Sequence, residues 1–305
     1  MRTYLTIGFC ALTLLLSPYI GRAATISPST IELTSARGQE IESAVTIINT
    51  GASEQVYFLD LLGFTPTEET GTPAFAPIDP TDELAYWIKF PTKEVLVPAQ
   101  SKVSVPFQVI VPDDVPSGGY YIAITVSTAP TDVVTTNGAT IEAKTAMLVF
   151  LTVEGETTES LALLEFNVEH KGTTLPQSLF SFRVQNQGNV HLTPEGSVKL
   201  KGPFGNVIAV LDANQAQGRV LPDSTRLFQV LYEMNGLSFM ERAGYQLSHL
   251  AIGPMTAELH LSYGTSGEIT AEASIWSTPW ELISILVGGL LVLLALFRKR
   301  QKKSK

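Results

Sequence analysis

The sequence predicts an all-β protein with two immunoglobulin-like β-sandwich domains followed by one C-terminal transmembrane helix. Short runs rich in Val, Ile, Thr, Phe and Tyr recur along the chain, and Gly, Pro, Asn and Asp separate them. No long helical pattern appears before the last apolar stretch. About 255 of the 305 residues lie between two hydrophobic ends, which is ample for two domains.

The C-terminal stretch predicts a membrane helix at residues 280–298, with a basic tail at 299–305. Residues 282–297 carry no charge, and a bilayer core needs roughly 20 apolar residues at helical rise. Positive charge beside a span stays on the cytoplasmic side. The residues expected at the membrane interface are Trp276, Trp280, Arg298, Lys299 and Arg300. A buried core helix with a basic tail is the alternative.

The N-terminal stretch predicts a secretory signal peptide at residues 1–23. Arg2 precedes an apolar run, and small residues surround the expected cleavage after Ala23. Cys10, the only cysteine, lies inside the apolar run and not at the cleavage site. We therefore expect a mature chain without disulfides and without a cysteine metal site.

The charge of the chain is divided unevenly between its parts. The whole chain has 20 Lys+Arg, 29 Asp+Glu and a net charge of -9. Eight of the basic residues lie at the two ends, so the segment between them carries 12 basic residues, all 29 acids and a net charge of -17. This acidity argues against nucleic acid as a partner.

The first sandwich is expected at residues 24–156. Its clearest strand is 102–111, where Val and Phe alternate with mostly polar residues. Pro106 cannot donate a ladder hydrogen bond, which favours an edge position or a bulge there. The other strands are expected near 26–33, 41–49, 55–64, 86–90, 94–97, 120–128 and 139–153, the last pairing with 120–128, and residues 65–84 are expected to be irregular.

The second sandwich is expected at residues 159–275, after a short polar joint. Its strands are expected at 161–169, 179–186, 197–201, 207–211, 226–233, 255–263 and 268–275. No strong internal repeat relates it to the first. Residues 49–51 and 186–189 place Asn and Gly where turns need left-handed backbone, and 98–101 redirects the chain between strands.

Several motifs of the first domain resemble one bacterial family when taken in order. They are Ile26-Ser27-Pro28-Ser29, Val45-Thr46-Ile47-Ile48-Asn49-Thr50-Gly51, Val95-Leu96-Val97-Pro98-Ala99-Gln100-Ser101, Val109-Ile110-Val111-Pro112 and Pro116-Ser117-Gly118-Gly119-Tyr120-Tyr121. In this respect, residues 25–155 resemble the extracellular domain of the WxL-interacting surface proteins of Gram-positive bacteria. The resemblance implies peptidoglycan binding. The second domain departs from that family, and its segments 186–196 and 220–226 are similar to anchored bacterial surface proteins in general.

The long loop at residues 64–87 is the candidate ligand site. Aromatic faces can stack on sugars while carboxylates accept hydrogen bonds from hydroxyl groups. The residues expected to do so are Phe75, Asp79, Asp82, Tyr86 and Trp87. Alternatively, Phe75 and Trp87 plug the sandwich and the acids are solvated. Asp79, Asp82 and Glu83 do not match the spacing of calcium loops, so no metal is expected.

No catalytic constellation is visible in the sequence. His170, His191, His249 and His260 are isolated, and no nucleophile elbow, phosphate loop or dinucleotide fingerprint occurs. We therefore expect a protein that is not an enzyme and that needs no cofactor.

These features predict an anchored surface protein whose sandwiches bind cell-wall glycan, another surface protein, or both. The alternatives are a structural stalk and an assembly chaperone that uses an edge strand. We expect a single pass through the plasma membrane, contact with lipid through the helix, extracellular domains and a cytoplasmic tail. No Leu-Pro-x-Thr-Gly sorting signal precedes the helix, so the helix is expected to be retained.

Overall fold

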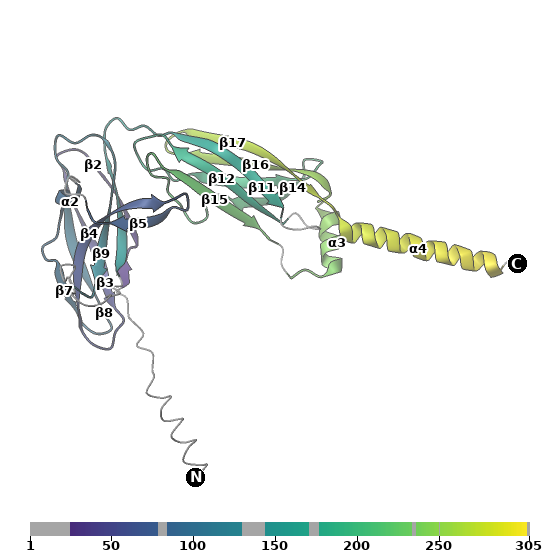
Figure 1. Ribbon diagram of the computed structural model, residues 1–305, viewed down its shortest axis with the longest axis horizontal. Helices are drawn as coiled ribbons and strands as arrows, with labels where there is room; N and C mark the ends of the chain where they lie inside the picture. Colours follow the sequence, from purple (N-terminus) through teal and green to yellow (C-terminus); the bar gives the residue numbers. More distant parts are fainter. Residues whose placement is uncertain are drawn as a thin grey trace, which may run out of the picture. The chain divides into compact units, whose positions relative to one another are not determined.

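The computed structural model describes residues 25–78, 84–129, 144–170, 177–233, 236–249 and 251–303 (Figure 1). The expected signal peptide and residues 139–143 of the expected strand 139–153 lie outside these ranges. By its contacts, the chain forms two compact units. Residues Phe64–Phe75 and Val115–Tyr120 group with the second unit, together with everything from Thr152 onward.

Two antiparallel sheets make up the first unit, but some of their ends, including residues 72–75, group with the second unit. One has the order β1-β3-β8-β6, and the other has β2-β10-β9-β4-β5 with β7 also paired to β4. Their bounds are β1 Thr25–Ser27, β2 Thr30–Ser35, β3 Glu40–Asn49, β4 Gln55–Thr67, β5 Thr72–Ala76, β6 Ile88–Lys89, β7 Glu94–Val97, β8 Ser101–Ile110, β9 Gly118–Ser127 and β10 Thr145–Val153. As expected, β10 is the neighbour of β9.

The second unit is a sandwich of a three-stranded and a four-stranded sheet. Their orders are β11-β12-β15 and β14-β13-β16-β17. The bounds are β11 Leu161–His170, β12 Ser178–Asn186, β13 Glu195–Lys201, β14 Val207–Asp212, β15 Thr225–Tyr232, β16 Gly253–Tyr263 and β17 Gly267–Ser277. The fold class expected from the sequence, two immunoglobulin-like sandwiches before a C-terminal apolar helix, is confirmed.

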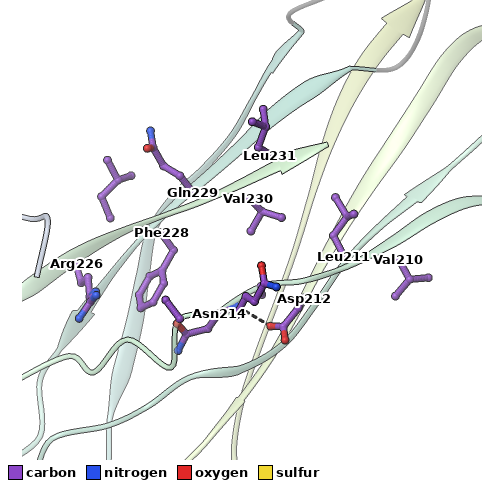
Figure 2. A pocket seen from close by; sticks show the side chains of 13 residues that line it. Val210, Leu211, Asp212, Asn214, Arg226, Phe228, Gln229, Val230 and Leu231 are labelled. Carbon is purple, nitrogen blue, oxygen red and sulfur yellow. Dashed lines mark hydrogen bonds between the residues drawn. The ribbon is translucent and has the colours of Figure 1, made fainter. Parts of the chain in front are cut away.

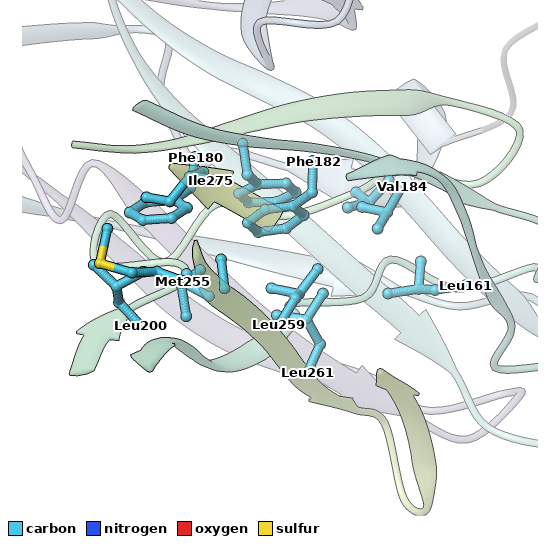
Figure 3. Close-up of a cluster of buried hydrophobic side chains, with 14 of the residues drawn as sticks. Leu161, Phe180, Phe182, Val184, Leu200, Met255, Leu259, Leu261 and Ile275 are labelled. Carbon is cyan, nitrogen blue, oxygen red and sulfur yellow. The ribbon is translucent and has the colours of Figure 1, made fainter. Parts of the chain in front are cut away.

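Period-two alternation produces the core of the second unit (Figure 3). Alternate residues of β12 are buried from Ser178 to Asn186, and the intervening residues are only partly covered. Phe182 stacks on Phe228 with ring centroids 5.1 Å apart. Both sheets contribute, because Leu259 and Leu261 of β16 belong to the same buried cluster. The hydrophobic contact between the two sheets therefore holds this unit together.

A buried asparagine at the end of a strand has the same role in each sandwich. Asn49 ends β3, and its Nδ2 donates to the carbonyl oxygen of Val97 (3.1 Å). Asn186 ends β12, and its Nδ2 donates to the carbonyl oxygens of Val190 (2.8 Å) and Val220 (2.9 Å). In both turns the Oδ1 accepts the N–H of the glycine two residues later. The two Asn-x-Gly turns are thus equivalent, a structural repeat that sequence similarity did not reveal.

Four local elements differ from the sequence-based expectation. The single strand expected at 26–33 is divided into β1 and β2, which belong to different sheets. Residues 84–87 form a short helix, α2 (Leu84–Trp87), where a strand was expected from 86. Part of the expected irregular stretch is strand, because β4 runs to Thr67 and β5 follows as its neighbour. A helix that was not expected, α3 (Phe239–Ser248), lies between β15 and β16.

Pro106 lies in β8 opposite Ala44 of β3. On its other side, β8 pairs with β6 only at Gln108 and Val109. Pro106 therefore occupies a stretch of β8 that, among the described residues, has a ladder partner on one side only. This is consistent with the expected edge position.

The last element, α4 (Trp280–Lys303), is a long helix with an exposed apolar surface. Among the described residues, Trp280–Arg300 is the one helix segment whose length and apolar composition would allow it to cross a membrane. Only Thr278 and Pro279 separate it from β17.

The two asparagines generate the first testable prediction. Asn186→Ala leaves the carbonyls of Val190 and Val220 and the N–H of Gly188 without this partner, and each buried unsatisfied group costs about 1–3 kcal/mol. We expect this variant to lower the unfolding temperature of the second unit. Asn49→Ala should lower that of the first unit. Calorimetry of the full chain in detergent should show each variant shifting one transition, and a shift of neither would contradict the assigned role.

Candidate functional site

A groove of about 830 Å³ runs between β14 and β15, the edge strands of the two facing sheets (Figure 2). Figure 2 shows Phe228 and Val230 pointing from β15 into this groove, with Val210 and Leu211 on the β14 side and Arg226 near one end. At Asp212 the chain leaves β14 in a turn, in which the N–H of Asn214 donates to Asp212 Oδ1 (2.8 Å). A volume of this size lies in the upper part of the range of ligand sites, which is roughly 300–1,000 Å³.

The outer backbone of β15 is open along part of the groove. The N–H of Leu227 points away from β12, because it donates to the carbonyl oxygen of Glu69 (2.8 Å). Since strand residues alternate, the N–H and C=O groups of Gln229 and Leu231 point the same way. In the described part of the chain, no strand pairs with them on that side.

Apolar side chains line the same edges. Val210 of β14 and Leu231 of β15 are among the large exposed hydrophobic residues of the unit, and both line the groove. Behind them lie Phe228, which is buried, and Val230, which is half-buried. Open backbone groups beside an apolar trough are the features that an added β-strand requires, because the main chain supplies hydrogen bonds and alternate side chains fill the trough.

Arg226 gives the groove a positive charge at one end. Its guanidinium lies 5.3 Å from the centre of the Phe228 ring, and Nη1 donates to the carbonyl oxygen of Arg219 (2.8 Å). Within the described ranges, no carboxylate forms an ion pair with it. Burial, with the neighbouring Arg219 charge, lowers the pKa of the Arg226 guanidinium. The group stays protonated, so a cation is held partly desolvated without a counterion.

Two glycines leave room for this guanidinium. A Cβ on Gly71 would lie 2.3 Å from Arg226 Cζ, and one on Gly218 would lie 2.6 Å from its Nη2. Gly71 also has a φ of 71°, which disfavours other residues. Glu69 does not neutralise Arg226, because its carboxylate pairs with Arg183 instead, where Arg183 Nε lies 2.7 Å from Glu69 Oε2. This pairing lowers the pKa of Glu69.

The residues expected to bind a ligand are placed as follows. Trp87 ends α2 and is 4% exposed. Tyr86 is 61% exposed on α2, and Phe75 is 44% exposed on β5. Asp79 and Asp82 lie outside the described residues. Glycan binding at this loop therefore stays a prediction.

The residues expected at a membrane interface flank or belong to α4. Trp276 near the end of β17 and Trp280 at the start of α4 are both exposed. Arg298, Lys299 and Arg300 lie in the last turns of the same helix, beyond its apolar part. This order is the one that a spanning helix requires.

The described residues contain no group of three or more His, Cys, Asp or Glu side chains that could hold a metal ion. Among the histidines, His249 stacks on Tyr245 with ring centroids 4.0 Å apart, at the end of α3. The expectation that the protein is not an enzyme stays a prediction.

The fold and the groove define the chain as an immunoglobulin-like sandwich protein with an open strand edge. No family model matches the chain, and no curated protein matches it. The resemblance to WxL-interacting proteins therefore stays a prediction.

Among solved structures, the chain is similar to several chaperones. A class 5 fimbriae chaperone, CfaA, shares 13% identity at a TM-score of 0.40, covering 84% of this chain and 99% of that one. The YadV chaperone shares 12% at 0.39, covering 83% and 100%. The E. coli chaperone DraB shares 10% at 0.36, covering 82% and 95%. Sequence identities and TM-scores this low carry no argument about function.

Sequence reasoning predicted both β14 and β15 but not the groove between them. Arg226 ends the segment 220–226 that is similar to anchored surface proteins, but only the fold shows that, among the described residues, no carboxylate pairs with it. The one available signal was a basic residue at the start of a strand in an acidic domain, which is too common to single out a site.

Arg226 and Arg183 generate the second prediction. Arg226→Met removes a desolvated cation that lacks a counterion and keeps an apolar stem over Phe228. We therefore expect the unfolding temperature of the second unit to stay unchanged or rise. Arg183→Met breaks the pair with Glu69, which is part-exposed, so we expect only a slight lowering of the unfolding temperature. Thermal unfolding of both variants checks the contrast, and a large loss of stability in Arg226→Met would contradict it.

Proposed function

We propose that this protein is a membrane-anchored surface protein that binds an extended segment of a partner protein by strand addition in the groove between β14 and β15. Helix α4 provides the anchor, with the sandwiches on the outer side of the membrane and Arg298, Lys299 and Arg300 on the inner side. This reading is closest to the alternative of an assembly chaperone that uses an edge strand.

The open position beside β15 is the observation that carries this proposal. In the first unit, β8 follows the segment whose Val97 carbonyl accepts from Asn49, and β6 pairs with the outer side of β8. The corresponding strand of the second unit, β15, has no such neighbour in the part of the chain that is described. The position that the first unit fills with its own chain is therefore available to a partner in the second unit.

The chemistry of the partner segment follows from the groove. Gln229 and Leu231 offer backbone groups that a strand can pair with, at a net gain of about 0.5–1.5 kcal/mol for each hydrogen bond. Val210, Phe228, Val230 and Leu231 favour apolar side chains at alternate positions. Arg226 favours a carboxylate at one end, either an acidic side chain or a chain terminus. The fimbrial chaperones described above are too distant to support this choice, which rests on the groove.

Peptide selection tests the proposal. The full chain in nanodiscs is used to select binders from a random library of peptides of about eight residues, which is within the usual length of a strand. We expect the selected peptides to alternate apolar and polar residues and to carry a carboxylate. Hydrogen exchange should show that the bound peptide protects the amides of Gln229 and Leu231. Peptides without alternation, or protection confined to other segments, would contradict strand addition and favour a stalk.

A double-mutant cycle tests the charge. Arg226→Met should weaken a carboxylate-bearing peptide about tenfold or more, because a hydrogen bond to a charged group contributes about 1.5–3 kcal/mol. Replacing the carboxylate of the peptide by an amide should weaken binding to the unchanged protein by the same factor. Combining the amide peptide with Arg226→Met should cause no further loss of affinity. Lys199→Met removes a cation from β13 and is the matched control, for which we expect no change. Additive losses would show that Arg226 does not contact the carboxylate.

A further inference from the structure

Helix α3 presents one face to the second unit and leaves the other face free. Ala243 and Gln246 are buried, and Tyr245 packs against the core of the sandwich. The hydroxyl oxygens of Tyr245 and Tyr232 lie 2.6 Å apart, and burial together with this contact raises the pKa of Tyr245. The helix is therefore docked firmly by this face.

The free face of α3 is apolar. Met240, Gly244 and Leu247 lie at positions i, i+4 and i+7, which places them in one stripe. Met240 is 68% exposed and Leu247 is 62% exposed, and Phe239 is also exposed beside them. The acidic Glu241 points elsewhere on the helix, where its carboxylate closes a capping box with Ser238. A stripe of this kind facing water would be unfavourable.

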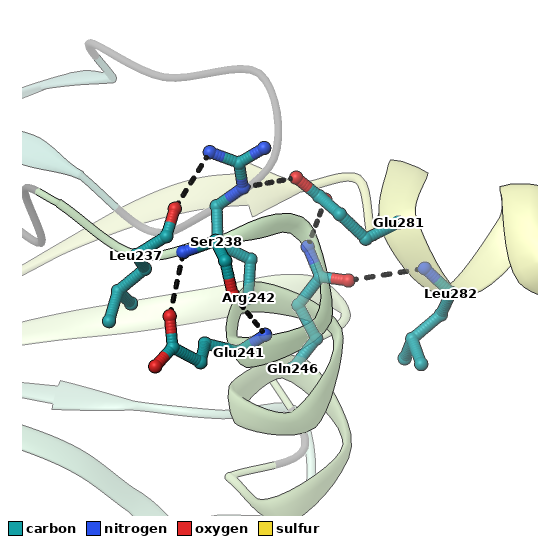
Figure 4. Close-up of polar contacts among 7 residues, drawn as sticks. All are labelled: Leu237, Ser238, Glu241, Arg242, Gln246, Glu281 and Leu282. Carbon is teal, nitrogen blue, oxygen red and sulfur yellow. Dashed lines mark hydrogen bonds and ion pairs between the residues drawn. The ribbon is translucent and has the colours of Figure 1, made fainter.

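A buried polar network fixes α3 to the first turn of α4 (Figure 4). The carboxylate of Glu281, which is almost fully buried, accepts from Arg242 Nε (2.8 Å) and from Gln246 Nε2 (2.7 Å). Gln246 Oε1 in turn accepts the N–H of Leu282 (3.4 Å). Figure 1 shows α3 running across the axis of α4 at its start, not along it. If α4 crosses a membrane, α3 lies at the depth where the membrane surface begins.

We infer that α3 is an interfacial helix whose stripe of Met240, Gly244 and Leu247 lies in the headgroup region of the membrane that α4 crosses. The lipid surface is the occupant because Arg242 and Gln246 hold α3 against the first turn of the apolar helix α4. The exposed Trp276 and Trp280 lie just before and at the start of that helix. Tryptophan favours this depth, and apolar helix faces insert into it. The inference rests on the proposed membrane anchoring.

The charges of α3 also define the kind of lipid contact. Arg242 is its one basic residue, and that guanidinium already pairs with Glu281. The contact is therefore hydrophobic and does not depend on anionic lipid, in contrast to basic amphipathic helices. Vesicles of phosphatidylcholine alone should support it as well as vesicles containing phosphatidylglycerol.

Depth measurements on the full chain test this inference. Cys10 is replaced by Ser, and single cysteines are introduced as Met240→Cys, Leu247→Cys, Leu290→Cys in α4 and Glu272→Cys in β17. Each carries an environment-sensitive fluorophore, and the chain is reconstituted in phosphatidylcholine vesicles with spin-labelled lipids. We expect positions 240 and 247 to be quenched most by a label near the headgroup, position 290 most by a label deep in the acyl chain, and position 272 by neither.

The outcomes separate the inference from the anchor. If position 290 is quenched and positions 240 and 247 behave like 272, the anchor stands and the interfacial helix is wrong. If position 290 is also unquenched, the proposed anchoring fails, and the inference fails with it. Blue-shifted emission at 240 and 247 without quenching would indicate a protein contact, such as a second copy, and would equally overturn the lipid assignment.

Hydrogen exchange gives an independent reading. Amides of α3 should exchange more slowly in nanodiscs than in a Met240→Glu/Leu247→Glu variant, whose substitutions are at exposed positions and should leave the fold intact. A Leu164→Glu/Phe204→Glu variant changes two comparably exposed apolar residues elsewhere in the unit and is the matched control. Equal exchange of α3 in all three proteins would contradict the inference.

Discussion

The buried carboxamide of Asn186 is the contact on which the groove depends. It holds the carbonyl of Val220, while its own backbone N–H and C=O pair with Ser224 and Asp223. These bonds fix the segment that leads into β15. The same segment supplies the Arg219 carbonyl that orients the Arg226 guanidinium. The position of Arg226, at the charged end of the groove, therefore depends on the side chain of Asn186, which lies at the end of the neighbouring strand β12.

The two sandwiches use this asparagine in the same way but finish their sheets differently. In the first unit, β7 pairs with β4 in the facing sheet, and β6 pairs with β8. In the second unit, β14 pairs with β13 in the facing sheet, and nothing in the described chain takes the place of β6. Among the described residues, the presence of the short strand β6 in the first unit and the lack of a counterpart in the second thus decide which edge is closed and which is open. The groove is a property of strand order, and no residue motif encodes it.

Local periodicity explains how much of this structure could be predicted. The strands of the second unit follow strict alternation, and β12, β13 and β16 were predicted to within two residues at each end. Helix α3 was missed because its ten residues mix Phe239, Met240 and Leu247 with polar residues in a pattern too short to distinguish from a loop. The hairpin of β4 and β5 was missed because its Thr, Pro and Gly residues suggest turns.

The candidate site could not be predicted in the same way. Residues of β14 and β15 face each other across the groove only because the two sheets stack, and alternation within one strand carries no information about the opposite sheet. The aromatic residues of the predicted ligand loop were selected by residue type alone. Residue type does not distinguish a ring exposed to a ligand from one buried in the core, and Trp87 is buried.

The network around Glu281 has a mechanical consequence. Arg242 and Gln246 of α3 donate hydrogen bonds to Glu281 in the first turn of α4, and only a short connection links that helix to β17. The helix therefore cannot swivel about its own axis without turning the second sandwich with it. A force applied at the groove therefore acts on α4 through this hydrogen-bonded joint, so the second sandwich and its helix respond to load as one body.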